Sequence, residues 1–247
     1  MYTCIDYSLL LFNASYAMIL ESIFSCTNLT LTCGSSIYIL IRHSYAQYSK
    51  LLTHVACACA SIAMIGSRSL IVLVYKLFFK DYTFDPFMMQ LEEERNKERF
   101  NIIDEIFRTL SMAGLIYSLY SCHGYYALGA CVVTSLSILD LFKLYRIKKK
   151  QTEEMEMSRF YDNSSETKAT YESRLNIFNW VILGGSFAYT VGNNYAVVAN
   201  YPLLLANWAL SPEGFYQGWT MRRTINDYLM ATYVMCMTEA LRQAGTS

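Results

Sequence analysis

Few residues in this chain have side chains suited to chemistry, and five of them lie within or beside long apolar stretches. These are Glu21, Arg68, His123, Asn193 and Asn194. A charged or strongly polar group in hydrocarbon costs free energy unless it is paired or hydrated, so each is a functional candidate by default. The chemistry they suggest is proton relay, or the binding of a transported substrate or ion.

Glu21 and Arg68 lie at similar distances from the short segment that joins the first two apolar stretches. Glu21 precedes Arg42 by 21 residues and Arg68 follows Lys50 by 18, which corresponds to roughly 31 and 27 Å of helix. An ion pair between Glu21 and Arg68 is therefore geometrically reasonable. We prefer the interpretation that both reach the headgroups at a membrane surface, and a transport role is a third alternative.

His123 and the pair Asn193 and Asn194 are expected at one depth in a membrane. They lie about 16 and about 18 residues from the inner ends of their apolar stretches. Glycines and a proline make the second stretch easy to break, and interrupted helices that meet at one depth mark binding sites in transporters. Hydrogen bonding between helices, or contact with a neighbouring subunit, is the more common role of such residues.

Sequence patterns typical of catalytic or metal sites are missing. There is no His-Glu-x-x-His, Cys-x-x-Cys, phosphate-binding loop or nucleophile elbow. We therefore predict a protein that is not an enzyme and that has no metal site and no cofactor. The eight cysteines lie mostly in apolar stretches, where reduced thiols pack as small hydrophobic groups. The formal net charge is zero, so nucleic acid is not an expected partner.

Long uncharged stretches must position these residues. No charged side chain occurs in residues 22–41, 51–67, 109–139 or 175–212, and a membrane-spanning helix needs about 20 predominantly apolar residues. We expect an all-α, polytopic membrane protein with about four transmembrane helices plus amphipathic helices outside the membrane. Five or six spans remain as alternatives, because the last two stretches are long enough to form pairs of helices.

The charges divide the chain into five segments. Residues 1–79 are expected to form a helical hairpin of two spans, and residues 80–142 an amphipathic helix that continues into the third span. Residues 143–174 are dense in charge and are expected to form a polar loop. Residues 175–212 are the fourth, easily broken span. Residues 213–247 have helical spacing but too short an apolar core to cross a bilayer, so we place this amphipathic tail helix on the membrane surface or against a partner.

Small residues predict where helices approach one another. Cys59, Ala63 and Ser67 recur at every fourth position, and Gly184 and Gly185 are adjacent. Rows of small side chains let the backbones of two membrane helices come close. We expect both groups to lie at packed helix surfaces.

Aromatic and acidic residues near the ends of spans are expected at a boundary. Clusters of Tyr and Trp, among them Tyr125, Tyr126, Trp180 and Tyr201, suit either the interfacial belt of a membrane protein or a protein interface. Asp140 lies where the third span should end, and we interpret it as an interfacial anchor.

The proposed orientation follows from basic residues near the ends of spans. Five of them fall in residues 143–150, and the first twenty residues have none, which places the N-terminus outside and the 143–174 loop inside. We expect a non-catalytic integral membrane subunit or scaffold of a larger assembly, with lipid and other membrane protein subunits as partners. An energy-transducing complex of an organellar inner membrane is one suitable setting. The alternatives are a small transporter or channel with a site near His123 and Asn193 and, least favoured, an intramembrane enzyme.

Overall fold

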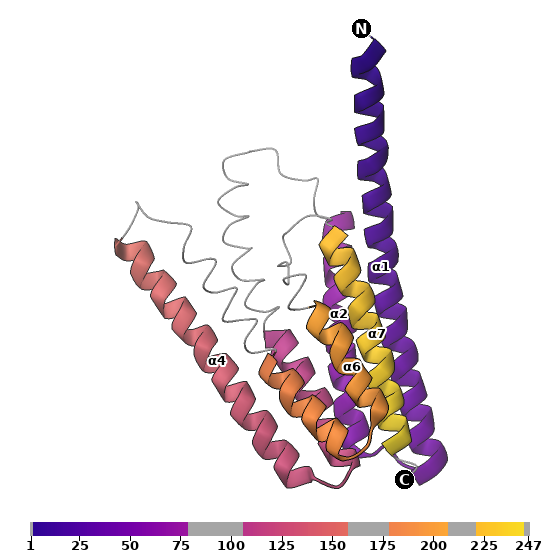
Figure 1. Cartoon of the computed structure of the whole chain (residues 1–247), viewed down its shortest axis with the longest axis vertical. Helices are drawn as coiled ribbons and strands as arrows, with labels where there is room; N and C mark the ends of the chain where they lie inside the picture. The colour runs from indigo at the N-terminus through magenta and orange to yellow at the C-terminus, as the bar shows by residue number, and fades with distance from the viewer. Residues whose placement is uncertain (1, 79–105, 158–177, 207–220, 245–247) are drawn as a thin grey trace.

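The described part of the chain is a bundle of helices. The computed structural model describes residues 2–78, 106–157, 178–206 and 221–244, and the regular structure within these ranges is helical throughout. The labelled helices are α1 (Tyr2–Tyr48), α2 (Thr53–Phe78), α4 (Tyr126–Met157), α6 (Asn194–Leu204) and α7 (Met221–Ala244) (Figure 1). Residues 106–122 and 178–190 form two further helical segments. The all-α fold expected from the sequence is confirmed for these residues.

Successive helices run in opposite directions and reverse at one end of the bundle. The reversals lie at residues 49–52, 123–125 and 191–193. Figure 1 shows these three connections at one end, together with the C-terminal end of α7, whereas α1 begins at the opposite end. We call the end formed by the three connections and the last turn of α7 the turn end.

The first two apolar stretches form the expected helical hairpin. α1 has 47 residues and is about 70 Å long, and it packs along α2. Segments Ile23–Tyr48 and Thr53–Ile71 are long and apolar enough to cross a membrane. These two candidate spans agree with the predicted positions of the first two, and the structure does not show four.

The stretches expected to form the third and fourth spans are each a short helical hairpin. Gly124 and Gly192 have φ angles of 84° and 70°, which glycine adopts without steric cost. The N–H groups of Tyr125 and Asn193 donate to the carbonyls five residues back, at 3.0 and 2.9 Å, and both glycine N–H groups donate three residues back, at 3.1 Å. This is the Schellman arrangement, which ends a helix and satisfies its last carbonyls. The third stretch is thus a pair of helices, the alternative to the preferred single helix, and the fourth stretch is also divided in two.

The added reversal at residues 123–125 changes the course of the chain after it. α4 continues to Met157, so the first part of the 143–174 segment is helix and not loop. The C-terminal end of α4 and the N-terminal end of α1 lie at the same end of the bundle (Figure 1), whereas the basic residues had placed them on opposite sides of a membrane. The expected helix at 80–105, the rest of the polar loop and the end of the fourth stretch lie outside the described residues.

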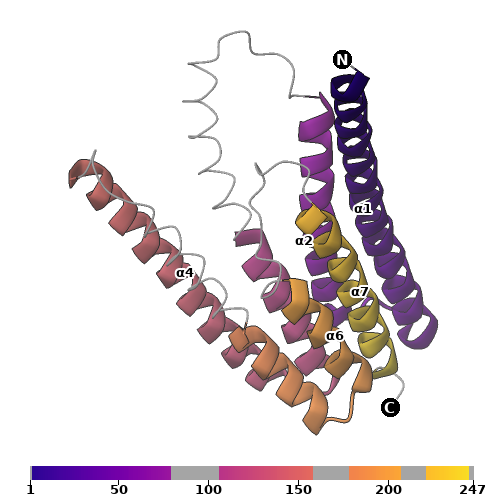
Figure 2. The same ribbon diagram turned by 45° about the horizontal axis from the view of Figure 1, so that its top comes forward.

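α7 belongs to the bundle. It packs lengthwise against α1 and α6 (Figure 2), although its sequence pattern had suggested a place on a membrane surface or against a partner. Tyr233, Val234 and Met237 are buried along its length. Within the described residues the chain thus provides its own partner for the apolar face of this helix.

Glycines allow the two short hairpins to pack closely. A Cβ atom on Gly129 would lie only 2.6 Å from Cβ of Tyr120. One on Gly184 would lie 3.4 Å from Ile116, and one on Gly185 would lie 3.1 Å from Asn200. Both Gly184 and Gly185 therefore lie at close helix contacts.

The small residues expected to form the packed face of α2 lie elsewhere on that helix. Ala63 is exposed, and Cys59 and Ser67 are half-buried. The buried face instead contains Ala58 and Ser61. Spacing alone identified a row of small side chains but not the direction in which the row faces.

Candidate functional site

Four charged residues on four helices lie at similar distances along their helices from the turn end. They are Arg68 on α2, Arg108 on the 106–122 segment, Asp140 on α4 and Asp227 on α7. Counted along each helix from its end at the turn end, they lie about 23, 21, 21 and 26 Å away. Arg108, Asp140 and Asp227 are buried and Arg68 is half-buried. We call these four residues the charged layer.

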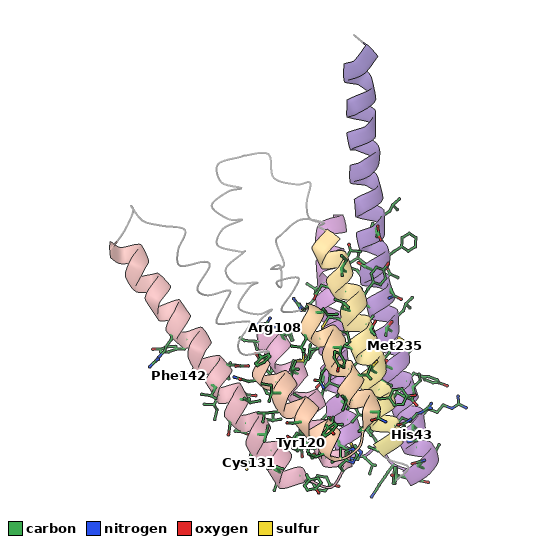
Figure 3. All side chains as sticks on the ribbon, viewed as in Figure 1. His43, Arg108, Tyr120, Cys131, Phe142 and Met235 are labelled. Carbon is green, nitrogen blue, oxygen red and sulfur yellow. The ribbon has the colours of Figure 1, made fainter. Side chains whose placement is uncertain are left out.

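The charged layer contains two positive and two negative side chains, so its formal charge is zero. Figure 3 labels Arg108 well above Tyr120 on the same helical segment, away from the turn end. The layer's two aspartates, Asp140 and Asp227, accept hydrogen bonds from neighbouring helices, which offsets part of the cost of removing a charge from water. The arrangement suits a structural polar layer that fixes how the helices fit together.

Asp227 is held in the contact between α7 and α1. The hydroxyl of Ser25 donates to Oδ2 of Asp227 at 3.3 Å, and the thiol of Cys26 donates to the same oxygen at 3.4 Å. Ser25, Cys26 and Asp227 are all buried. A carboxylate that accepts two donors from another helix ties the two helices together at a defined height.

Asp140 is held in the same way by the helical segment 178–190. The indole Nε1 of Trp180 donates to Oδ2 of Asp140 at 2.7 Å, and both side chains are buried. From the sequence, Asp140 was expected to be an interfacial anchor and Trp180 to belong to an aromatic belt. Within the described residues both side chains instead face each other inside the bundle, because the chain reverses at residues 123–125.

Glu21 and Arg68 do not form the ion pair considered from the sequence. Both residues lie in the described part of the chain, and Glu21 is exposed on α1 while Arg68 is half-buried on α2. No ion pair between the two is seen there. Arg68 belongs instead to the charged layer.

His123 and Asn193 meet at the turn end, where the two short hairpins reverse. Nδ2 of Asn193 lies 3.5 Å from Nε2 of His123 and donates to the carbonyl of Ala240 on α7 at 2.9 Å. Oδ1 of Asn193 accepts the N–H of Ala196 at 3.1 Å, which caps the start of α6. Asn193 thus connects three elements, and we call His123, Asn193 and Ala240 the turn site.

The turn site differs in two ways from the site expected from the sequence. His123 lies in a connection between helices and not in the middle of a span. Asn194 is exposed on the first turn of α6 and has no part in the contact. Burial lowers the pKa of His123, which favours the neutral imidazole, and the ring packs edge-on against Phe187 at a centroid distance of 5.9 Å.

Arg108 and Asp227 were not anticipated from the sequence. Arg108 stands just outside an uncharged stretch, and Asp227 lies in a helix judged too short to span a membrane. A signal for Asp227 was present, because Ala231 and Val234, four and seven residues later, are buried on the same helix face. An acidic residue that continues an apolar stripe indicates a buried carboxylate.

The described polar groups make contacts between helices. No cluster of three or more His, Cys, Asp or Glu that could hold a metal ion occurs among the described residues. The seven cysteines whose side chains are described are free thiols, as expected for packing residues. Compared with known proteins, the chain matches no family model, no curated protein and no solved structure.

Proposed function

We propose that this chain is an integral membrane bundle that acts as a non-catalytic subunit or scaffold of a larger membrane assembly. The observation that carries the proposal is the exposure of large apolar side chains along the candidate spans, around an interior in which serines are buried among apolar residues. Large apolar side chains point outwards along the candidate spans, and small polar side chains point inwards. Water disfavours the first arrangement, whereas hydrocarbon favours both.

α1 combines exposed large apolar side chains with serines buried beside Leu29 and Leu40. Phe24, Leu31 and Tyr38 are 66%, 67% and 63% exposed, whereas Ser25 and Ser36 on the same helix are 0% and 3% exposed. All five lie within the candidate span Ile23–Tyr48. Serine in a membrane interior gains by facing another helix, since its hydroxyl can bond there and its small size lets backbones approach.

The same pattern continues on other helices. On α2, Leu70 and Ile71 are exposed while Ser61 and Ser69 are buried. On the 106–122 segment, Ser118 is fully buried, and its hydroxyl donates to the carbonyl of the residue four positions back at 2.6 Å. The repetition on helices far apart in sequence supports one apolar solvent around the bundle.

Features that extend from the bundle support the role of a subunit. α4 diverges from the other helices (Figure 2), and its exposed apolar side chains include Ile138, Leu139 and Phe142. Figure 3 shows Phe142 on the outer side of this helix. α1 continues beyond the bundle towards its N-terminus (Figure 1), where the sequence is again rich in apolar residues. Apolar side chains that the described residues leave exposed on α4 suit contact with other membrane proteins.

Two measurements test the proposal. Membranes containing the chain are washed with alkaline carbonate, and an integral protein stays in the pellet while a peripheral one is released. Blue-native electrophoresis in mild detergent, followed by mass spectrometry, then reveals whether the chain migrates with other subunits. Release by carbonate refutes the membrane bundle, and migration as a free monomer refutes the subunit role while leaving the membrane bundle intact.

A small transporter or channel is the second candidate, and the turn site and charged layer favour it. Charged side chains buried within the bundle, with a histidine and an asparagine where two hairpins reverse, resemble the polar groups of transporter interiors. Flux through proteoliposomes, measured for the wild type and for the His123→Ala and Asn193→Ala variants, tests this candidate. Asn194→Ala is the matched control, because Asn194 is exposed beside the site. Flux that both site variants leave unchanged removes the turn site from consideration.

A further inference from the structure

We infer that the turn end is a surface for anionic lipid headgroups, an inference that rests on the proposed membrane location. Six exposed tyrosines surround the three connections, each within four residues of one of them. They are Tyr45, Tyr48, Tyr125, Tyr126, Tyr189 and Tyr195. Tyrosine is enriched at the headgroup level of membranes, where its ring meets hydrocarbon and its hydroxyl meets water. A ring of exposed tyrosines at one end of a bundle places that end at a bilayer surface.

The charge of the turn end selects the kind of lipid. Arg42 and Lys50 are near the first connection and both are exposed. Residues 36–56, 117–131 and 186–198 contain no acidic residue. Glu239 is the one carboxylate in the last two described turns of α7, and it is paired with Arg242 at 2.9 Å. The described residues at this end therefore have a net positive charge.

The histidines of the chain also gather at this end. The chain has three, and His43, His54 and His123 all lie within about six residues of a connection at the turn end. The far end of α4 differs, because residues 143–157 mix acidic and basic side chains in sequence. Among the described residues, exposed tyrosines, basic residues and a near absence of acid come together at the turn end.

Phosphatidylglycerol and similar anionic phospholipids fit this surface. Each basic residue close to an anionic membrane surface strengthens binding by about fivefold, so Arg42 and Lys50 together account for roughly thirtyfold. A protein partner would have to bring its own acidic groups to the same plane as the tyrosines. A bilayer with anionic lipid supplies both environments in one layer.

The test compares two lipids on the purified full chain in detergent. Phosphatidylglycerol and phosphatidylcholine are titrated separately, and the shift of the thermal unfolding midpoint gives an apparent Kd for each. We expect tighter binding of phosphatidylglycerol by the wild type. The Arg42→Gln/Lys50→Gln variant should weaken it roughly thirtyfold and leave phosphatidylcholine unchanged. The matched control is Arg146→Gln/Lys149→Gln on α4, away from the turn end, and it should leave both values unchanged.

Three results overturn the inference. Equal affinities of the wild type for the two lipids refute a preference for anionic headgroups. An equal loss in the control variant demonstrates a general effect of charge, and an unchanged affinity in the Arg42 and Lys50 variant removes these two side chains. Carbonate extraction separates these results from failure of the proposed function, since a chain that stays in the membrane but prefers neither lipid refutes only the lipid surface.

Discussion

The hydrogen bond between Trp180 and Asp140 provides a quantitative test of the charged layer. Its Nε1 to Oδ2 distance is 2.7 Å and both side chains are buried. A bond to a buried charged acceptor contributes about 1.5–3 kcal/mol, whereas bonds between helices within membranes average about 0.6 kcal/mol. We expect the larger value, because the acceptor is a carboxylate that lacks access to water.

Trp180→Phe removes the donor and keeps most of the apolar ring. At about 2 kcal/mol the variant should unfold at a midpoint about 4–8 °C below that of the wild type. A double-mutant cycle with Asp140→Ala then isolates the bond from the change in packing. Far-UV circular dichroism in detergent reports the unfolding of all four proteins.

The control for this cycle is Phe178→Leu, two residues away on the same helical segment. Phe178 is 50% exposed, so its replacement should change stability by less than about 0.5 kcal/mol. The reasoning is refuted if the coupling between Trp180 and Asp140 is below about 0.5 kcal/mol, because the two changes would then simply add. A midpoint in Phe178→Leu as low as in Trp180→Phe would mean that the assay does not resolve buried from exposed positions.

Three further predictions concern the hairpins. Gly129→Ala should destabilise the protein by about 1–3 kcal/mol through overpacking. Gly34→Ala should not destabilise it, because no atom lies within 4 Å of the added Cβ. The unfolding midpoints of the two variants in detergent test this difference. Asn193→Ala should lower the free energy of unfolding by about 2 kcal/mol, because a helix cap and an interhelical hydrogen bond are lost. It should also speed amide hydrogen exchange in the last turns of α7. Equally fast exchange in the control Asn194→Ala, at an exposed position, would contradict this. Burial lowers the pKa of His123 below the unfolded value of about 6.5. The neutral imidazole is therefore compatible with the fold above that pH, and stability is lost as the pH falls below it. The decrease in the unfolding midpoint between about pH 7.5 and 5.5 should be smaller in His123→Gln than in the wild type.

The first two helices were predictable because each contains one long stretch of residues without charge. About twenty residues without charge identify a helix that leaves water, and α1 and α2 were found where this pattern predicts them. The two short hairpins were harder, because the same absence of charge continues through the reversal. Gly124, which follows an apolar helical stretch, was the local sign of an end, and it was outweighed by the length of the uncharged run.

The charged layer could not be predicted from the positions of charged residues along the sequence. Asp140 was assigned to an interface because it closes an uncharged stretch, and only the reversal at residues 123–125 reveals that it faces Trp180. Asp227 meets Ser25 from a helix 202 residues away in sequence. Contacts of this kind depend on which faces of distant helices meet, and a single sequence contains no measure of that. The turn site was partly predictable, since similar distances from the ends of their apolar stretches suggested that His123 and Asn193 share a depth.

The length of α1 has a mechanical consequence. An unbroken helix of 47 residues keeps its hydrogen bonds along the whole axis, so it resists bending more than a chain of short helices would. A force or tilt applied to the N-terminal turns of α1 is therefore transmitted along the whole helix. It passes the position where Ser25 and Cys26 donate hydrogen bonds to Asp227. A protein bound to the protruding part of α1 would therefore alter the packing of α7.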